Sequence, residues 1–530
     1  MNPWRLAAPV IALVMAMPLC VVFGSVFVPT GETWTHLATY VLPAVTRNTV
    51  WLVLVVAVGT LLVGTLSAWL TAVVEFPGRG FFVWAMMLPL AVPGYVFAFA
   101  LAGVFGYSGP ASDLWRTVTG QPLPQWGGGA ASASCLILGL YPYVYLLARQ
   151  AFLTQGRQSL EVAQSLGLTR LAGFWRVALP LARPWLAAGV ALVIMETLAD
   201  FGTVKVFNFD TFTTAIYAAW FGLFSLPAAL QLSAVLLLAV AAAVVLERFW
   251  RGASRFSAQN GSAPQRRLQP SVSQRWLAFG FCALVFALAF VIPVGQLLLW
   301  ALAHAEVEWM PRYWGYARSS LILASAAALL VTSLALLLGF ADRHAPARTT
   351  RISVIVATLG YALPGTVLAV GFFAVIAGLG HALSAAVEWL SPGAAGVTLT
   401  GTLLVMLLAY AARFLAVAYS PITSGFERIT PTLDEAARGL GASGWRILRR
   451  VHWPLLSGGT ATAALLVFVD VMKELPITLI TRPFGWDTLA TRIFQLTTEG
   501  EWERAALPAL AVVIAGLAPV LWLQRQDTTG

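Results

Sequence analysis

The chain has 530 residues, of which 59% are hydrophobic and only 10% are charged, with a formal net charge of +10. Soluble globular chains carry about 25% charged residues, so this composition indicates a membrane protein. The basic balance does not indicate nucleic-acid binding, because the arginines gather in loops between apolar stretches.

About twelve stretches are long and apolar enough to cross a bilayer as helices. They cover residues 8–28, 49–74, 81–107, 131–152, 184–206, 226–247, 276–304, 319–340, 352–378, 396–419, 455–480 and 505–523. The first stretch is expected to be retained, because it outruns a signal's short apolar core and shows no small-x-small cleavage site. The sequence therefore predicts an all-α polytopic membrane protein with about twelve spans.

A polar segment divides the chain into two halves. Residues 251–275 are rich in Ser, Gln and Arg and read as a flexible linker. The first half is then 1–250 and the second is 276–530. An even number of spans in each half gives both the same orientation, so the halves are predicted to be parallel six-helix repeats. The arginine-rich loops place both termini and the linker in the cytoplasm.

Short motifs recur between the halves at an offset of 271 residues. "RNT" at Arg47 corresponds to "RSS" at Arg318, and Pro93-Gly94 corresponds to Pro364-Gly365. The Pro-Gly pairs fall inside predicted spans, where freed backbone groups are tolerated only against protein or a wet cavity. A plain kink and a place on a transport pathway remain alternatives.

A polar loop recurs at an offset of 274. "EVAQSLG" begins at Glu161 and "EAARGLG" begins at Glu435. Each copy is predicted to form one short helix with an apolar stripe, and Gly167 and Gly441 are expected to end it in the left-handed conformation. Prolines that follow suit the first turn of the next membrane helix; they are Pro180 and Pro454.

The repeated loop resembles that of bacterial ABC importer permeases, in which Glu-x-Ala-x-x-x-Gly is followed by a hydrophobic residue and Pro. The resemblance implies a type I importer fold and two coupling helices, in loops 153–183 and 421–453, that dock on two copies of a cytoplasmic ATPase subunit. The residues that carry the implied contact are Glu161, Ala163, Gly167, Glu435, Ala437 and Gly441. The chain departs from the pattern at Val162 and Trp453.

The sequence does not contain a phosphate-binding loop of the P-loop type. Such a loop needs Gly-x-x-x-x-Gly-Lys-Ser/Thr, and neither of the lysines, Lys205 and Lys473, follows a glycine. The chain is therefore not expected to be an enzyme or to bind a cofactor. ATP and magnesium are expected on the partner subunit.

Acidic residues follow each repeated loop at equivalent positions. Glu196 and Asp200 lie four residues apart on one helix face, and Asp470 and Glu474 match them at an offset of 274. Ionisable groups inside a membrane line cavities or pair with one another. Two alternatives stay open here: a translocation path for a cationic cargo, or structural pairing with nearby basic residues.

The segments around these acids resemble fused iron(III) importer permeases, over 140–152, 196–220 and 473–494. The resemblance implies ferric iron as cargo, delivered by an extracytoplasmic binding protein to a permease of the bacterial inner membrane. Hard oxygen ligands suit ferric ion, although no metal ligand is certain. Both halves also contain Asp-Thr-x-x-Thr, which predicts an extracytoplasmic gate or a docking site for the binding protein at Asp210, Thr211, Asp487 and Thr488.

Alternative functions share part of this pattern. Thiamine, polyamine, sulfate and phosphonate permeases have the same architecture. An ion-coupled secondary transporter is also built from parallel repeats, but it has no ATPase to receive the repeated loops. A membrane scaffold leaves the intramembrane acids unexplained.

Overall fold

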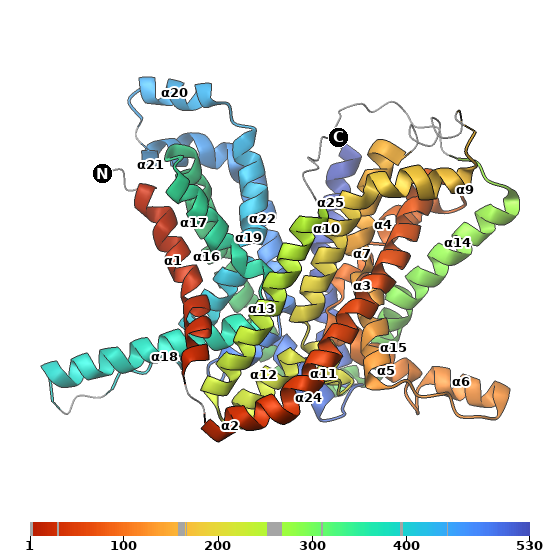
Figure 1. The fold of residues 1–530 in the computed structure, drawn as a ribbon, viewed down its shortest axis with the longest axis horizontal. Coiled ribbons are helices and arrows are strands. Elements are labelled where there is room, and N and C mark those ends of the chain that lie inside the picture. Colours follow the sequence, from red (N-terminus) through yellow and green to blue (C-terminus); the bar gives the residue numbers. More distant parts are fainter. Residues whose placement is uncertain are drawn as a thin grey trace. The chain divides into compact units, whose positions relative to one another are not determined.

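The computed structural model describes residues 4–28, 31–156, 165, 167–251, 268–308, 311–392, 396–442 and 444–529. Most of those residues are helical, with one isolated bridge between Val74 and Leu268 as the sole β pairing among them. The chain forms two compact units (Figure 1). Unit 1 contains 1–39, 215–237 and 309–495, and unit 2 contains 40–214, 238–308 and 496–530.

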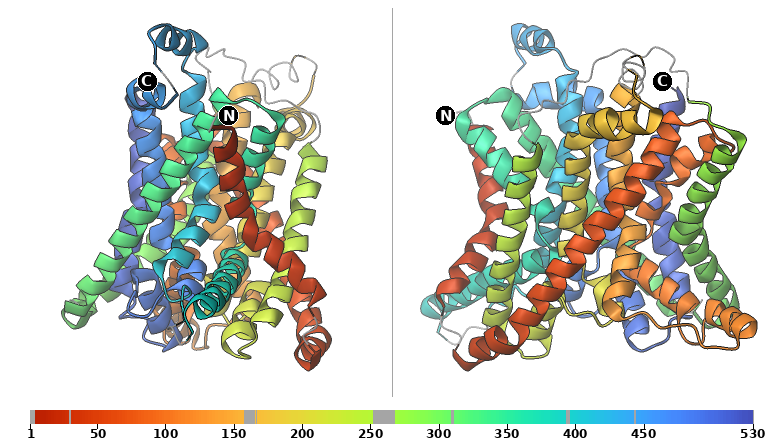
Figure 2. Two further views of the ribbon diagram at one scale, coloured as in Figure 1. Left: turned by 90° about the vertical axis from the view of Figure 1, so that its left-hand side faces the viewer. Right: turned by 45° about the vertical axis from the view of Figure 1, so that its right-hand side comes forward.

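Unit 1 is built on three helices that pack on one another: α16 (Pro311–His344), α19 (Leu403–Glu427) and α22 (Trp453–Lys473). The helix α1 (Trp4–Gly24) packs against α16, α17 and α18. Figure 2 shows α20 beyond the ends of α19 and α22. The other helices of the unit are α2 (Gly31–His36), most of α12 (Phe212–Phe221), the start of α13 (Leu226–Arg251), α17 (Arg348–Thr358), α18 (Gly365–Leu390), α20 (Pro431–Gly439), α21 (Gly444–Ile447), α23 (Pro476–Thr481) and α24 (Leu489–Thr498).

Unit 2 repeats this plan with α3 (Leu42–Val73), α7 (Gly128–Ala151) and α10 (Leu179–Ala199), which also pack on one another. The helix α15 (Ile292–Glu308) packs against α5 and α25, and α14 (Val272–Phe286) packs against α4. The remaining helices are α4 (Arg79–Ala85), α5 (Gly94–Phe105), α6 (Pro110–Thr119), α9 (Arg170–Gly173), α11 (Gly202–Val206) and α25 (Ala506–Thr529).

The two units cut across the two halves of the sequence. Unit 1 combines most of the second half with residues 1–39 and 215–237 of the first. Unit 2 combines most of the first half with 276–308 and 496–530 of the second. Unit 1 therefore includes α1 and the start of α13 from the first half, and unit 2 includes α14, α15 and α25 from the second. The predicted boundary at 251–275 stays a prediction about the sequence repeat.

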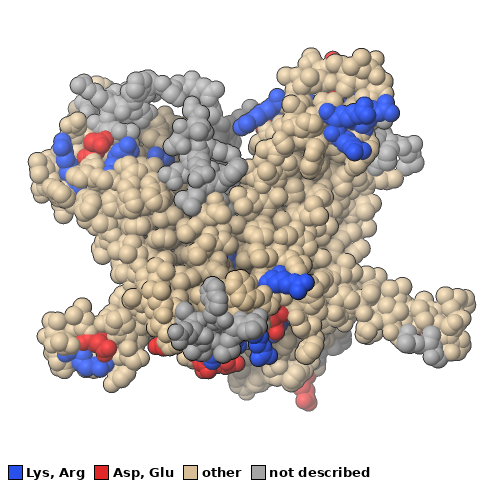
Figure 3. Space-filling model, turned by 180° about the vertical axis from the view of Figure 1, so that it is seen from behind, with Lys and Arg blue, Asp and Glu red and all other residues tan. Residues whose placement is uncertain are grey.

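Ten helices of the described residues are long and apolar enough to cross a membrane. They become eleven if the bent pair Arg79–Ala91 and Gly94–Thr119 is one span, and a shorter apolar helix, Ala506–Ala518, lies at the last predicted stretch. The predicted all-α membrane fold is confirmed, with ten or eleven long spans where about twelve were expected. On the face drawn in Figure 3, most of the surface carries no charged side chain.

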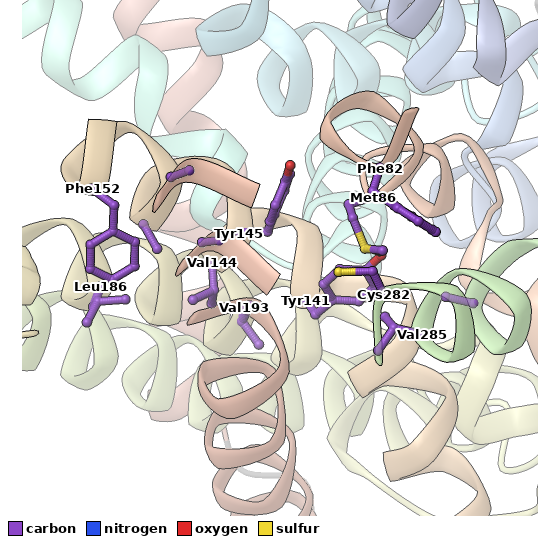
Figure 4. Close-up of a cluster of buried hydrophobic side chains, with 14 of the residues drawn as sticks. Phe82, Met86, Tyr141, Val144, Tyr145, Phe152, Leu186, Val193, Cys282 and Val285 are labelled. Atoms are coloured by element: carbon purple, nitrogen blue, oxygen red, sulfur yellow. The ribbon is translucent and has the colours of Figure 1, made fainter. Parts of the chain in front are cut away.

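Close helix packing in unit 2 depends on two glycines around Val144. A Cβ on Gly64 of α3 would lie 2.8 Å from the Val144 Cβ, and one on Gly189 of α10 would lie 3.0 Å from the Val144 Cα. Glycines at such positions let membrane helices approach closely. Figure 4 shows the buried cluster beside this contact, in which the Tyr145 hydroxyl donates to the Val83 carbonyl at 2.8 Å.

Both Pro-Gly pairs break a helix. Pro93 and Pro364 are extended, with ψ of 143° and 137°, and each is preceded by a short 3-10 helix, at Leu88–Ala91 and Leu359–Ala362. In unit 2 the two helix segments around the break are bent by 100°. The predicted spans 81–107 and 352–378 are therefore interrupted by a sharp break.

Candidate functional site

The second copy of the repeated loop forms α20. Thr430 stands at the N-cap with extended backbone and Pro431 follows at the first helical position. At the other end the Gly441 N–H donates to the Arg438 carbonyl at 2.9 Å, and the Ala442 N–H donates to the Ala437 carbonyl at 3.0 Å. This pair of bonds is a Schellman motif. Gly441 has φ of +80°, so the prediction that it ends the helix is confirmed.

The helix α20 has a buried face and an exposed one. Asp434 and Ala437 are buried, whereas Glu435 is exposed. Two apolar side chains on the helix and at its end face outward, since Leu433 is 44% exposed and Leu440 is 89% exposed. Exposed apolar side chains on a short helix outside the membrane spans are typical of a surface that a partner covers.

Asp434 connects α20 to two membrane helices. Its Oδ2 accepts a hydrogen bond from the Arg343 Nε at 2.8 Å, and its Oδ1 lies 2.6 Å from the His452 Nε2. Burial alone would raise the pKa of the Asp434 carboxyl, but the hydrogen bonds from His452 and Arg343 outweigh it and hold that pKa below its ordinary value. The carboxylate is therefore the stable form in this structure.

The first copy of the loop is described only in part. Glu161 and Ala163 lie outside the described residues. Gly167 is exposed and has φ of +82°, the left-handed conformation found at Gly441. The following membrane helices begin at equivalent places, with Pro180 in the first turn of α10 and Pro454 in that of α22, as the sequence predicts.

Two of the four predicted pathway acids cap short helices. The Asp200 carboxylate accepts from the Thr203 hydroxyl at 2.9 Å and from the Val204 N–H at 3.1 Å, at the start of α11. The Glu474 carboxylate accepts from the Ile477 N–H at 3.0 Å, at the start of α23. These bonds satisfy backbone donors that a helix start leaves open.

The Pro-Gly pairs and these caps meet in space, which the sequence did not predict. A Cβ on Gly94 would lie 3.3 Å from the Asp200 Oδ1, and one on Gly365 would lie 2.6 Å from the Glu474 Oε1. The proline breaks the helix and the glycine leaves room for the carboxylate. The Pro-Gly pairs recur at an offset of 271 residues and the acids at an offset of 274, and these similar offsets were the signal that connects them.

The other two acids of the predicted path lie one turn earlier. Asp470 forms an ion pair with Lys473, with its Oδ1 2.8 Å from the Nζ. Glu196 is half-buried on α10. The structure thus brings Asp200 and Glu474 to equivalent positions beside the helix breaks, and the translocation path stays a hypothesis.

The Asp-Thr-x-x-Thr motifs begin α12 and α24. The Thr211 N–H donates to the Thr214 hydroxyl at 2.9 Å, and the Thr488 N–H donates to the Thr491 hydroxyl, also at 2.9 Å. Thr211 and Thr488 are 4% exposed, so their side chains belong to helix caps. Asp210 is exposed and Asp487 forms an ion pair with Arg482. Docking of a binding protein at this motif stays a prediction.

The "RNT" and "RSS" repeats reach the same caps. The Thr49 hydroxyl accepts from the Phe212 N–H at 3.4 Å, and the Ser320 hydroxyl accepts from the Leu489 N–H at 2.8 Å. Thr49 and Ser320 correspond at the offset of 271. The "RNT"/"RSS" repeat and the Asp-Thr-x-x-Thr repeat therefore form one structural feature in each unit. Among the described residues, no group of three or more His, Cys, Asp or Glu side chains could hold a metal ion.

The sequence matches the family described as "Binding-protein-dependent transport system inner membrane component" twice, over residues 60–252 and 331–526. These matches cover more than half of the chain. The chain belongs to this family. The two matched regions hold the two repeated loops, so each half carries one copy of the family's permease unit.

Several proteins from bacteria are similar to this chain. The Fe(3+)-transport system permease protein FbpB 2 of Haemophilus influenzae is 27% identical over 90% of this chain and 89% of its own. The probable ABC transporter permease protein y4fN of Sinorhizobium fredii is 24% identical over 90% of this chain and 86% of its own. The putative 2-aminoethylphosphonate transport system permease protein PhnV of Salmonella typhimurium is 34% identical over 24% of this chain and 48% of its own.

Among solved structures, a chain of a bacterial alginate ABC transporter in complex with an alginate pentasaccharide-bound periplasmic protein covers 47% of this chain and 93% of its own. It has a TM-score of 0.37 and 14% sequence identity.

Proposed function

We propose that this chain is the permease subunit of an ATP-driven importer for ferric iron. The observation that carries the proposal is α20, a short helix beyond the ends of α19 and α22 (Figure 2). It exposes Leu433 and Leu440. A partner subunit that binds this face would move α19 and α22 with it, because α20 begins shortly after α19 ends and leads into α22 through α21.

The proposed partners are two copies of a cytoplasmic ATPase, one on each repeated loop. ATP and magnesium bind to these subunits and not to this chain, which lacks a phosphate-binding loop. Closure of the ATPase dimer would rock the membrane helices and open the path on alternate sides. The residues proposed to form the contact in the first loop are Glu161, Ala163 and Gly167, and those in the second are Glu435, Ala437 and Gly441.

Ferric iron is supported by the relatives that match over nearly the whole chain. FbpB 2 covers 90% of it, whereas PhnV covers 24%. A binding protein on the extracytoplasmic side would deliver the cargo, and both termini of the chain would lie in the cytoplasm of the bacterial inner membrane. The acids Glu196, Asp200, Asp470 and Glu474 are proposed to line the cation's path.

Reconstitution in lipid vesicles tests this proposal. The permease is purified with the ATPase and the binding protein encoded beside it, and uptake of radioactive ferric iron is measured with ATP in the vesicle lumen. We expect uptake that needs the binding protein and stops when the ATPase carries a substituted P-loop lysine. Uptake of sulfate or 2-aminoethylphosphonate in place of iron would overturn the cargo, and uptake without the ATPase would overturn the importer class.

A further inference from the structure

An arginine, an aspartate and a histidine meet where α20 joins the membrane helices. Asp434 is 6% exposed and receives Arg343 on one carboxylate oxygen and His452 on the other. Arg343 lies in the last turn of α16, and His452 directly precedes α22. The cluster therefore links α20 and the start of α22 to α16, whose Arg343 lies 91 residues before Asp434.

Arg343 also closes the end of α19. Its Nη1 donates to the Phe426 carbonyl at 2.8 Å, and its Nη2 donates to the Ile429 carbonyl at 2.9 Å. The last carbonyls of a helix lack partners within the helix, and a guanidinium offers five donors in a rigid plane. One side chain thus holds α16, the end of α19 and the first turn of α20 together.

Asp434 forms a buried ion pair with Arg343, and both of its carboxylate oxygens accept hydrogen bonds. Each carboxylate oxygen of Asp434 has a charge-assisted donor within 2.8 Å. Such pairs are costly to bury, and removing one partner leaves an uncompensated charge. Loss of either donor is therefore expected to release α20 from its position.

The first half has no such cluster in its sequence. The positions that correspond to Arg343, Asp434 and His452 are Ala72, Leu160 and Ala178. Leu160 lies outside the described residues. In unit 2 Trp69 contacts Phe152 and Phe174, with ring centroids 5.2 and 4.6 Å apart. The second half also has aromatic contacts at the equivalent place, where Phe340 and Phe426 lie against His452, and it adds the ionic contact between Arg343 and Asp434.

We propose that Arg343, Asp434 and His452 are positioning residues that clamp α20 to α16, α19 and α22, so that the second coupling helix moves with them as one body. This inference rests on the proposed function for its role in transport, but the clamp itself is a property of this chain alone. It assigns the second half an ionic connection between its coupling helix and the membrane helices that follow and precede it.

Distances between spin labels test the clamp in the purified permease in lipid nanodiscs. Labels are placed at Leu440→Cys on the exposed end of α20 and at Thr349→Cys on α17, in a background without the native cysteines. We expect one narrow distance distribution in the parent. Asp434→Asn and Arg343→Gln should shift the ratio of clamped to released α20 by about tenfold or more, because each removes a charge-assisted hydrogen bond.

Matched controls remove the same charges nearby. Glu427→Gln and Arg428→Gln change exposed side chains at the end of α19 and should keep the narrow distribution. If Asp434→Asn is not recovered from the membrane, Arg343→Lys carries the same test, because it keeps the charge but loses the planar set of donors. Narrow distributions in the cluster variants would overturn the clamp.

Transport is measured on the same variants after addition of the ATPase and binding protein. A positioning role predicts more ATP hydrolysed for each cargo ion at normal membrane abundance, which a purely structural role would not produce. An unchanged ratio would overturn the role of the clamp in transport. Released α20 with unchanged ATPase binding would instead count against docking at α20, and so against the proposed function, while leaving the clamp intact.

Discussion

The glycine that ends α20 has a backbone conformation that other residues reach only with strain. Gly441 has φ of +80° and Gly167 has φ of +82°, and open space surrounds both. Strain at these positions would therefore come from the backbone and not from a clash. The position of the loop end, which brings the chain back toward the membrane, depends on that conformation.

We expect Gly441→Val to weaken binding of the ATPase subunit while membrane insertion stays normal. The strain is about 1–3 kcal/mol, which is enough to unravel the last turn of a short exposed helix. Pull-down of the ATPase with the permease measures the loss. Gly458→Ala is the control, since Gly458 lies within α22 with nothing near its Cβ position. Full association and transport by the double variant with Gly167→Val would contradict the coupling role.

The buried carboxylate of Asp434 predicts a response to acid. Its pKa is held below the ordinary value of 3.8, so its contribution to stability is complete above about pH 4 and is lost as the pH falls below it. We expect the difference in thermal stability between the parent and Asp434→Asn to shrink as the pH falls below about 4. Paired thermal unfolding scans check this. A difference that stays the same throughout that acid range would show that the charge of Asp434 is not involved.

At the scale of elements, each helix break packs against the acidic side chain that caps a short helix, and the two form one structural feature. The side chains of Asp200 and Glu474 close the starts of α11 and α23 while Gly94 and Gly365 make room for them. A capping role and a pathway role for these acids predict different effects of substitution. Shortening the side chain tests the cap, and removing only its charge tests the path.

We expect Asp200→Ala and Glu474→Ala to lower stability by about 0.5–2 kcal/mol, because a cap is lost. Asp200→Asn and Glu474→Gln keep an oxygen that accepts the same N–H, so membrane abundance should stay normal. Iron uptake by these neutral variants should fall if the carboxylates guide the cation, and we expect this result. Normal uptake when Glu196 and Asp470 are neutralised as well would remove all four acids from the path.

The hydrogen bonds that cap α12 and α24 differ in length, and this difference predicts unequal losses of stability when each is removed. Ser320 accepts from the Leu489 N–H at 2.8 Å, whereas Thr49 accepts from the Phe212 N–H at 3.4 Å. We expect Ser320→Ala to cost more stability than Thr49→Ala, within about 0.5–1.5 kcal/mol for one hydrogen bond. Thermal unfolding compares them, with Ser319→Ala as the control. Equal losses would mean that the two caps contribute alike despite their geometry.

At the scale of the whole molecule, the exchange of terminal helices makes each half incomplete alone. The α1 helix packs against α18, where Gly371 gives Pro18 a close approach, and α15 packs against α5, where Gly103 faces Trp300. These contacts join the first half to the second within each unit. Neither half therefore contains all of the helices that cover its own core.

We expect residues 276–530 expressed alone to be degraded, and co-expression with residues 1–250 as a separate chain to restore them. Membrane abundance and co-elution of the two fragments measure the effect. Co-expression of two fragments that both cover the same half is the control for the effect of expressing two chains at once. Normal abundance of either half by itself would contradict the exchange.

The sequence was sufficient for features that are local or repeated. Apolar stretches predicted the spans, and glycine spacing predicted the end of α20, because both depend on neighbours in the chain. The clamp at Asp434 was not predicted, since Arg343 lies 91 residues away and no repeat marks it. The exchange of helices between the halves was also missed, because periodicity shows which residues face lipid and not which helix covers them.

The exchanged helices impose an order on biogenesis. The core of unit 2 is made early, yet the α25 helix that covers it, with Gly516 against Ala91, leaves the ribosome after almost everything else. Until then the surface of unit 2 that α25 covers is exposed in the bilayer, where the insertion machinery and membrane proteases can reach it. A truncation late in the second half would therefore lead to degradation of the first half as well. The two coupling loops would be retained together or lost together.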